Sequence, residues 1–314
     1  MKNVYIVLII LLFVSSSTFA QFDYGFDFSK SGTSGLQFLK IGLGGKEVGF
    51  GSAASSTVND ASSVFWNPAG LGWMTQKQLF LSHNTWLVKS QHSALAFAMP
   101  INSVIVAVSA AVLNIKGFEE TTVLFPNGTG RQVEAGDMMF GVAVANKFTD
   151  KLTIGGQIKY VQEKLDDVSF NAILFDIGTI YFTGFRDLRL AFTLQHFGAD
   201  QKIFDQKFKM PLIFRIGAAD YIIKGDEFHI LTAVDLVHPT DNNEWVNWGL
   251  EVGFLKVFAL RGGYRFNVDE GALSLGFGLN LPILENTYSN IDYAYVSYGE
   301  IFGNTHRFSL SFTF

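Results

Sequence analysis

Histidine, serine and cysteine are the residue types most often used for catalysis and metal binding. In this sequence cysteine is absent, and the spacing of the histidines and serines matches no known catalytic or metal-binding motif. The six histidines are scattered along the chain: His83, His92, His196, His229, His238 and His306. No two of them have the i, i+4 spacing that places metal ligands on one helix face, and no Gly-x-Ser-x-Gly elbow occurs. The absence of cysteine excludes disulfides and thiol chemistry. We therefore expect no catalytic residue, no metal site, no cofactor and no enzyme activity.

Charged residues on the polar face of predicted strands are the remaining candidates. In a barrel whose polar face points inward, these would project into the lumen: Arg189, Arg215, Glu251, Arg261, Arg265, Arg307, Asp176 and Asp235. Because an unpaired buried charge is costly, we favour the interpretation that they pair with one another and with Lys46, Glu47 and Asp60 from the preceding segment. The alternative interpretation is that they line a permeation path.

Strands must position these charges, because the hydrophobic pattern has a period of two from Gln78 onward. At the C-terminus, Phe308, Leu310 and Phe312 alternate with Arg307, Ser309 and Ser311. The apolar face carries large residues throughout, whereas the polar face carries glycine, alanine and serine as well as charge. This asymmetry favours lipid outside and a lumen inside over a soluble sandwich with a bulky core.

The composition agrees with a membrane β-barrel. Hydrophobic residues make up 48% of the chain and charged residues only 16%, against about 25% charged in an ordinary soluble domain. After residue 20 no apolar run approaches the roughly 20 residues that a membrane helix needs. The net charge of −5 and the lack of basic clusters argue against nucleic acid as a partner.

We expect an all-β fold, a transmembrane antiparallel β-barrel of about 14 strands at residues 78–314. The predicted strands are Leu79–Leu87, His92–Met99, Ser103–Ile115, Asp137–Phe148, Lys151–Lys164, Val168–Phe182, Asp187–Phe197, Pro211–Ile223, Glu227–His238, Glu244–Phe254, Val257–Phe266, Ala272–Leu281, Asn290–Tyr298 and His306–Phe314. The longest predicted loops are Lys116–Gly136 and Gly198–Met210. Phe118 and Phe125 in the first of these could form an extracellular docking surface or a ligand-binding loop.

The N-terminal residues predict export. Met1–Ala20 has one lysine, an apolar run from Val4 to Val14 and small residues before Ala20, as in a secretory signal peptide cleaved after Ala20. Residues 21–77 would then form an N-terminal arm and a plug, or hatch, inside the barrel. Recurring glycines between Gly32 and Gly51 favour close backbone packing there.

A turn motif lies within this segment. Asn67-Pro68 fixes a change of direction, because proline locks its own φ and disfavours helix at the residue before it. The preceding residues from Thr57 to Trp66 predict a short helix that ends at the proline. The motif of interest is Trp66, Asn67, Pro68, Ala69, Gly70 and Leu71.

Together with Leu39–Gly42, Val48–Ala53 and Asn59–Ser63, this motif resembles the N-terminal signature of the PorV/PorQ group of FadL-like outer-membrane barrels. The resemblance implies a Gram-negative outer membrane, a hatch that fills the lumen, and a role in the type IX secretion system of Bacteroidetes-like bacteria. It implies contacts with outer-membrane lipid, with other secretion-system or outer-membrane proteins, and with the C-terminal domains of secreted cargo. The alternative is a FadL-like transporter for hydrophobic small molecules such as fatty acids or hydrocarbons.

Overall fold

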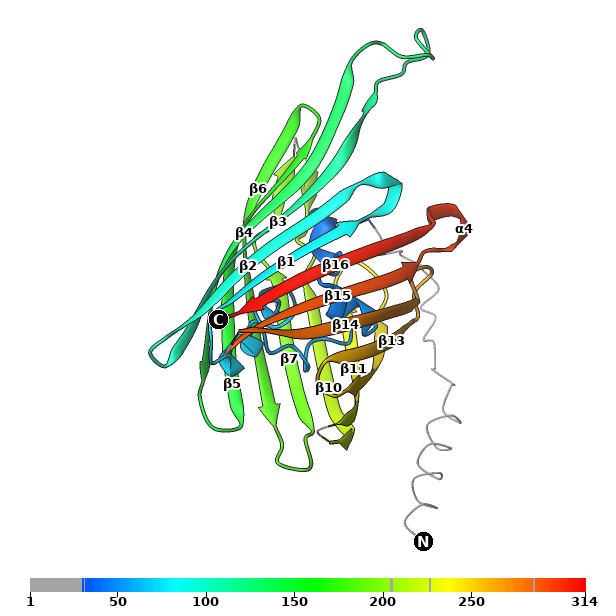
Figure 1. Ribbon diagram of the computed structural model, residues 1–314. Coiled ribbons are helices and arrows are strands. Elements are labelled where there is room, and N and C mark those ends of the chain that lie inside the picture. Colours follow the sequence, from blue (N-terminus) through cyan, green and yellow to red (C-terminus); the bar gives the residue numbers. More distant parts are fainter. Residues whose placement is uncertain (1–29, 31, 204–205, 226, 285) are drawn as a thin grey trace, which may run out of the picture. The chain divides into compact units, whose positions relative to one another are not determined.

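The computed structural model describes residues 30, 32–203, 206–225, 227–284 and 286–314, and within them fourteen strands form a closed antiparallel barrel (Figure 1). The predicted signal peptide and arm, residues 1–29, lie outside the described residues. The barrel strands are β1 (Gln78–Thr85), β2 (Gln91–Ile101), β3 (Val104–Glu119), β4 (Gln132–Lys147), β5 (Leu152–Leu165), β6 (Val168–Phe182), β7 (Arg189–Phe197), β10 (Ile213–Lys224), β11 (Phe228–Pro239), β12 (Trp245–Phe254), β13 (Phe258–Phe266), β14 (Leu273–Leu284), β15 (Thr287–Ser297) and β16 (Asn304–Thr313).

Each barrel strand pairs with its neighbours along the chain, and β1 pairs with β16 to close the ring. The predicted barrel and its strand number are therefore confirmed. Connections alternate between two ends of the barrel. The end with the hairpin tip Glu120–Arg131 is called the loop end, and the end with Phe314 is called the turn end (Figure 1).

The faces of the strands are those that the alternation predicts. On β16, Arg307, Ser309 and Ser311 are buried while His306 and Phe308 are exposed on the outside of the barrel. On β14, Leu273, Leu275 and Phe277 are likewise exposed. Large apolar side chains thus cover the outer surface, as they do where a barrel wall faces lipid.

Two predicted loops are corrected by the structure. The loop Lys116–Gly136 shrinks to Glu120–Arg131, because β3 and β4 continue pairing past a register shift between Ile115 and Phe118. The resulting hairpin reaches beyond the other connections at the loop end (Figure 1). The loop Gly198–Met210 contains a small hairpin of its own, β8 (Gln201–Ile203) with β9 (Gln206–Phe208).

The segment Ser34–Trp73, called the inner segment, contains four short helices joined by turns and irregular backbone. These are η1 (Gln37–Lys40), α2 (Gly45–Gly49), α3 (Ser63–Trp66) and η2 (Pro68–Trp73); two more, η3 (Leu87–Lys89) and α4 (Gly299–Phe302), lie in loop-end connections. As predicted, α3 ends at the residue before Asn67-Pro68, and Asn67 has extended backbone. Among the described residues, no helix is long and apolar enough to cross a membrane.

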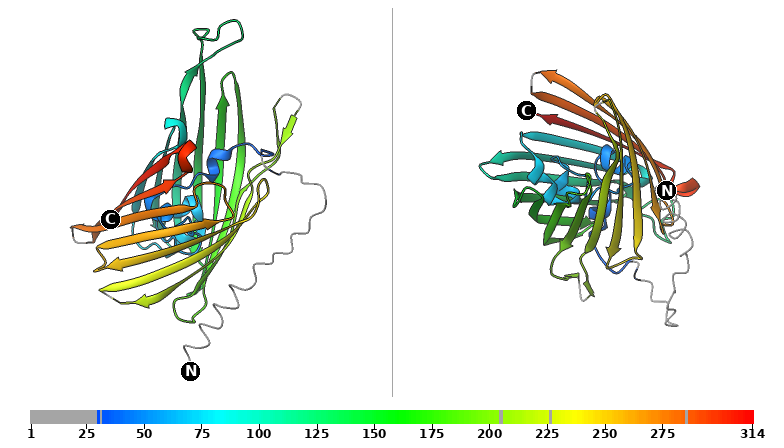
Figure 2. Two further views of the ribbon diagram at one scale, coloured as in Figure 1. Left: turned by 90° about the vertical axis from the view of Figure 1, so that its right-hand side faces the viewer. Right: turned by 90° about the horizontal axis from the view of Figure 1, so that it is seen from below.

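The inner segment packs against the inward-facing residues of the wall (Figure 2). It supplies large side chains to the core, such as Phe38 and Leu71, and the wall supplies alanines as well as larger residues such as Met139 and Leu174. The backbone N–H groups of Gly44 and Gly45 donate hydrogen bonds to Ser82 Oγ on β1 (3.2 Å) and Ser309 Oγ on β16 (2.9 Å).

Asn67 fastens the turn motif to the wall. Its side-chain amide donates to the carbonyl oxygens of Ser55 (2.7 Å) and Thr179 on β6 (3.2 Å), and its Oδ1 accepts from the N–H of Ala69 (3.0 Å). Trp66 donates from Nε1 to the carbonyl of Leu43 (2.9 Å). The motif predicted from sequence is therefore a buried connection between inner segment and barrel.

Candidate functional site

The inner segment lies between two cavities of the lumen. The cavity nearer the loop end has a volume of about 240 Å³ and is called the arginine cavity after Arg215, Arg265 and Arg307, which line it. The cavity nearer the turn end has a volume of about 380 Å³ and is called the turn-end cavity. Val48 of α2 lines the first and Lys46 lines the second, so opposite faces of one helix separate them.

Wall glycines mark the level at which the inner segment crosses the lumen. A β-carbon added to Gly249 would lie 2.3 Å from the carbonyl oxygen of Phe50, and one added to Gly263 would lie 2.2 Å from Cα of Gly51. Gly276 approaches Cα of Gly49 in the same way, at 2.9 Å. Only glycine permits such contact between backbones.

Gly249, Gly263 and Gly276 lie on β12, β13 and β14. On each strand, the residue two positions to one side of the glycine lines the arginine cavity, and the residue two positions to the other side lines the turn-end cavity. Asn247, Arg265 and Ser274 line the arginine cavity, whereas Glu251, Arg261 and Gly278 line the turn-end cavity. The strands β12, β13 and β14 thus present one layer to each cavity and a glycine layer to the inner segment between them.

Aromatic rings and arginines alternate around the arginine cavity. The guanidinium carbon of Arg215 lies 5.7 Å from the ring centre of Trp66, that of Arg265 lies 5.4 Å from Trp245, and that of Arg307 lies 5.2 Å from Trp86. Such stacking favours a guanidinium over a lysine ammonium, because the guanidinium is planar and weakly hydrated. Tyr298 and Lys40 complete the polar lining.

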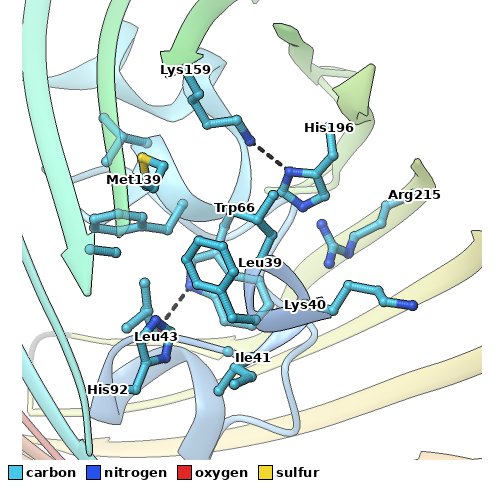
Figure 3. Close-up of a pocket in the computed structure, with 15 residues that line it drawn as sticks. Leu39, Lys40, Ile41, Leu43, Trp66, His92, Met139, Lys159, His196 and Arg215 are labelled. Carbon is cyan, nitrogen blue, oxygen red and sulfur yellow. Dashed lines mark hydrogen bonds between the residues drawn. The ribbon is translucent and has the colours of Figure 1, made fainter. Parts of the chain in front are cut away.

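An apolar recess of about 40 Å³ adjoins the arginine cavity and shares Ile41, Trp66 and Arg215 with it (Figure 3). Leu39, Leu43 and Met139 give it an apolar lining, and its polar lining includes the buried residues Lys159 and His196 (Figure 3). Lys159 Nζ lies 2.7 Å from both Asp176 Oδ2 and His196 Nδ1. The recess therefore combines an apolar lining with a fixed polar cluster.

The turn-end cavity has balanced charges. Arg261 lies between Glu251 and Asp292, with nitrogen–oxygen distances of 2.5 Å to each carboxylate. His229 Nε2 lies 3.2 Å from Glu251, and Lys46 pairs with Asp60 within the inner segment at 2.9 Å. The predicted pairing of lumenal charges is thus present at this level of the barrel.

Glu47 is the inner-segment carboxyl without an ion pair. Its Oε1 accepts a hydrogen bond from Ser62 Oγ (2.8 Å), while its Oε2 is buried without a partner. Burial, reinforced by repulsion from Asp60, raises the pKa of Glu47 to about 7. Burial would lower the pKa of Lys46, but attraction by Asp60 and Glu47 outweighs it and raises that pKa.

Replacing Glu47 with glutamine should stabilise the protein at alkaline pH and leave it unchanged at acid pH. The pKa of Glu47 in the folded state lies above the ordinary value of 4.5, so ionisation of this group lowers the free energy of unfolding as the pH rises from about 4.5 toward 7. Above about pH 7 the loss of stability is complete and no longer changes with pH. We expect Glu47→Gln to gain on the order of 2 kcal/mol at about pH 8 and nothing at about pH 3. Urea unfolding of both proteins at the two pH values measures this, and an equal gain at both would contradict it.

Other predicted site residues lie apart from the cavities. Phe118 and Phe125 are exposed on the β3–β4 hairpin and line none of the cavities described above. Arg189 lies between the rings of Phe182 and Tyr221, at 5.4 Å from each, and lines none of these cavities either. Asp235 accepts hydrogen bonds from the backbone N–H (2.9 Å) and hydroxyl (2.7 Å) of Ser55 and so holds the inner segment.

Sequence reasoning missed the aromatic part of the arginine cavity. Trp86, Trp245 and Tyr298 stand at or just beyond the loop-end termini of β1, β12 and β15. Each occupies an inward position by the same alternation that places Asn84, Asn247 and Val296 inside. Large aromatics at inward positions next to loops were therefore the signal that could have identified them.

No protein-family model and no curated protein matches this sequence. Solved structures resemble it in fold. The toluene transporter TbuX of Ralstonia pickettii is 12% identical, with a TM-score of 0.60 over 87% of this chain and 97% of that chain. The CymD monoaromatic hydrocarbon channel is 13% identical, with a TM-score of 0.61 over 87% and 97%. A FadL homologue of Pseudomonas aeruginosa is 11% identical, with a TM-score of 0.56 over 87% and 98%. At these identities the likeness establishes the FadL-like barrel fold that the sequence predicts.

Proposed function

We propose that this protein is an outer-membrane channel for hydrophobic small molecules, closed at rest by its inner segment. The observation that carries the proposal is that one thin layer, α2 and the residues next to it, separates two cavities of the lumen. A displacement of this layer joins the cavities into a passage. The apolar recess beside it, at about 40 Å³, is smaller than the roughly 150 Å³ of a cavity that holds benzene, so a solute such as toluene would have to widen it.

The outer surface and the fold support the membrane location. Large apolar side chains cover the barrel wall, and the N-terminal residues predict export. Proteins of the same fold are described as transporters and channels for toluene and other monoaromatic hydrocarbons. These compounds define the first solutes to test.

The secretion role implied by the PorV/PorQ resemblance stays a prediction. No family model supports membership of that group, and two of the solved structures compared above are described as a toluene transporter and a monoaromatic hydrocarbon channel. Mild detergent extraction followed by mass spectrometry separates the two roles. Large outer-membrane subunits or secreted proteins that share a C-terminal domain would favour secretion, whereas a lone barrel with bound lipid or hydrocarbon would favour uptake.

A reversible cross-link tests whether the inner segment is the gate. A β-carbon on Gly49 would lie 3.5 Å from that of Ala294 on β15, which is within the range for a disulfide. Because the chain has no cysteine, Gly49→Cys with Ala294→Cys introduces a single possible bond. We expect proteoliposomes with the oxidised variant to take up toluene at least about tenfold more slowly, and reduction to restore the rate.

The two single-cysteine variants are the controls, since each carries one of the two steric changes without the bond. Equal uptake by the oxidised and reduced forms would place the passage elsewhere than at α2. Failure of the unmodified protein to admit toluene or a fatty acid above the rate of empty liposomes would overturn the proposed function itself.

A further inference from the structure

The arginine cavity has an excess of positive charge. Among the described residues, Arg215, Arg265, Arg307 and Lys40 line it, and no aspartate or glutamate does. Lys40 is neutralised by Asp241 at the rim, with Nζ 2.8 Å from the carboxylate. The guanidinium groups of Arg215, Arg265 and Arg307 remain as positive charges that no carboxylate in the described lining neutralises.

These guanidinium groups have few protein partners. Among the described residues, the side chains of Arg215 and Arg265 have no hydrogen bond or ion pair, and buried nitrogens of both lack an acceptor. Arg307 donates only to neutral groups, including the carbonyl of Gly42 (3.3 Å) and Thr305 Oγ1 (2.7 Å). Arg215 is 8% exposed and Arg307 2% exposed, so bulk water does not replace the missing partners.

The carboxylates near these arginines already bind other groups. Asp241 accepts hydrogen bonds from Gln37 and Ser34 in addition to pairing with Lys40. Asp235 attracts Arg215 electrostatically, but its two oxygens bind Ser55 and form no ion pair with the arginine. Arg261 on the same strand as Arg265 shows the contrast, since two carboxylates surround it.

Each of the three guanidinium groups lies over a tryptophan ring, a contact that uses none of the hydrogen-bond donors of Arg215 and Arg265. The Nη2 atom of Arg215 and both Nη atoms of Arg265 are not buried and have no protein partner among the described residues, so they remain available to a ligand in the cavity. A planar fork of donors matches the oxygens of a carboxylate or phosphate. Three guanidinium charges around about 240 Å³ suit a compact ligand that carries more than one negative charge.

We propose that the arginine cavity binds a compact multivalent oxyanion, a small dicarboxylate or a phosphate ester, between Arg215, Arg265 and Arg307. The proposal rests on the proposed function only in that the lumen must admit small solutes. A neutral hydrocarbon leaves all three charges unmatched, and a monocarboxylate neutralises one of them. The preference for two or more charges is therefore the distinguishing property of the site.

Tryptophan fluorescence of the purified full-length protein in a zwitterionic detergent reports binding, because Trp66, Trp86 and Trp245 line the cavity. The probes are inorganic phosphate, phthalate, benzoate and toluene. We expect phthalate and phosphate to give saturable changes and to bind at least about tenfold more tightly than benzoate, with toluene giving no arginine-dependent change. Binding should weaken between about 0.05 M and about 0.5 M ionic strength. The ratio of phosphate to phthalate affinity identifies which oxyanion class the site prefers.

Arg265→Gln and Arg307→Gln should each weaken phthalate binding at least about tenfold. Arg189→Gln is the matched control, since Arg189 also stacks on aromatic rings but lines neither lumenal cavity. Equal weakening by the control, equal affinity for benzoate and phthalate, or no saturable change with either dianion would overturn the proposal. Toluene uptake measured on the same variants tests the proposed function separately, because it can persist when anion binding is lost.

Discussion

Gly263→Val should displace the inner segment from the barrel and destabilise the protein by about 3 kcal/mol or more. A β-carbon at this position would lie 2.2 Å from both Cα and N of Gly51, so a backbone must move to admit it. Flexible side chains cannot relieve the clash, because the atoms in contact belong to the main chain. Urea unfolding measures the stability, and limited proteolysis measures the release of the inner segment.

Gly262→Val is the matched control for this prediction. Gly262 is the preceding residue on β13 and faces the outside, where the nearest atom to an added β-carbon is Leu275 Cδ2 at 3.8 Å. Valine there keeps the barrel apolar on its outer surface and favours strand. If both variants lost the same stability, the loss would reflect β13 itself and not the contact with Gly51.

Asp176→Leu should destabilise the protein by about 3 to 5 kcal/mol. Asp176 is buried in the wall, pairs with Lys159 at 2.7 Å, and accepts a hydrogen bond from the backbone N–H of His196 at 2.7 Å. His196 has a positive φ of 63° where the β6–β7 pairing shifts register. Removing the carboxylate leaves both a buried ammonium and a buried N–H without their partner.

The double variant Asp176→Leu with Lys159→Met separates the charge from the packing. Replacing both members of a buried pair with apolar residues of similar size often restores stability, so we expect the double variant to be more stable than Asp176→Leu alone. Urea unfolding of the four proteins of this cycle provides the test. Glu134→Gln, at an exposed pair with Lys164, should have little measurable effect. A double variant as unstable as the single would show that the geometry of β7, and not the unpaired charge, is responsible.

Which side chains of a strand face the lumen could be predicted from the sequence, because this depends on each strand by itself. The side chains of Arg307 and Phe308 must face opposite sides of any strand, and only the lumen accepts the arginine. The motif around Asn67-Pro68 was predictable for a similar reason, since proline acts on its immediate neighbours. The end of β3 was not predictable in this way, because Gly117 suggests a loop while pairing with β4 continues past it.

Which of the lumenal charges are paired could be learned only from the three-dimensional structure. Arg261 and Arg265 lie on the same face of one strand, yet one is paired with two carboxylates and the other has none. Their difference depends on where Gly51 crosses the lumen, and contacts between distant segments decide that. The sequence prediction that lumenal charges pair therefore describes the turn-end cavity but not the arginine cavity.

The hydrogen bonds from Gly44 and Gly45 to Ser82 and Ser309 have a consequence for assembly of the barrel. These two serines stand on β1 and β16, the strands that join the ends of the ring. Pairing between these strands has the largest sequence separation of any strand pair in the barrel, so it carries the greatest loop-closure entropy. A segment that binds both strands brings them together and lowers this entropic cost. The same contacts link the start of α2 to the strands that close the barrel, so we expect a variant that loosens α2 to slow closure of the barrel as well.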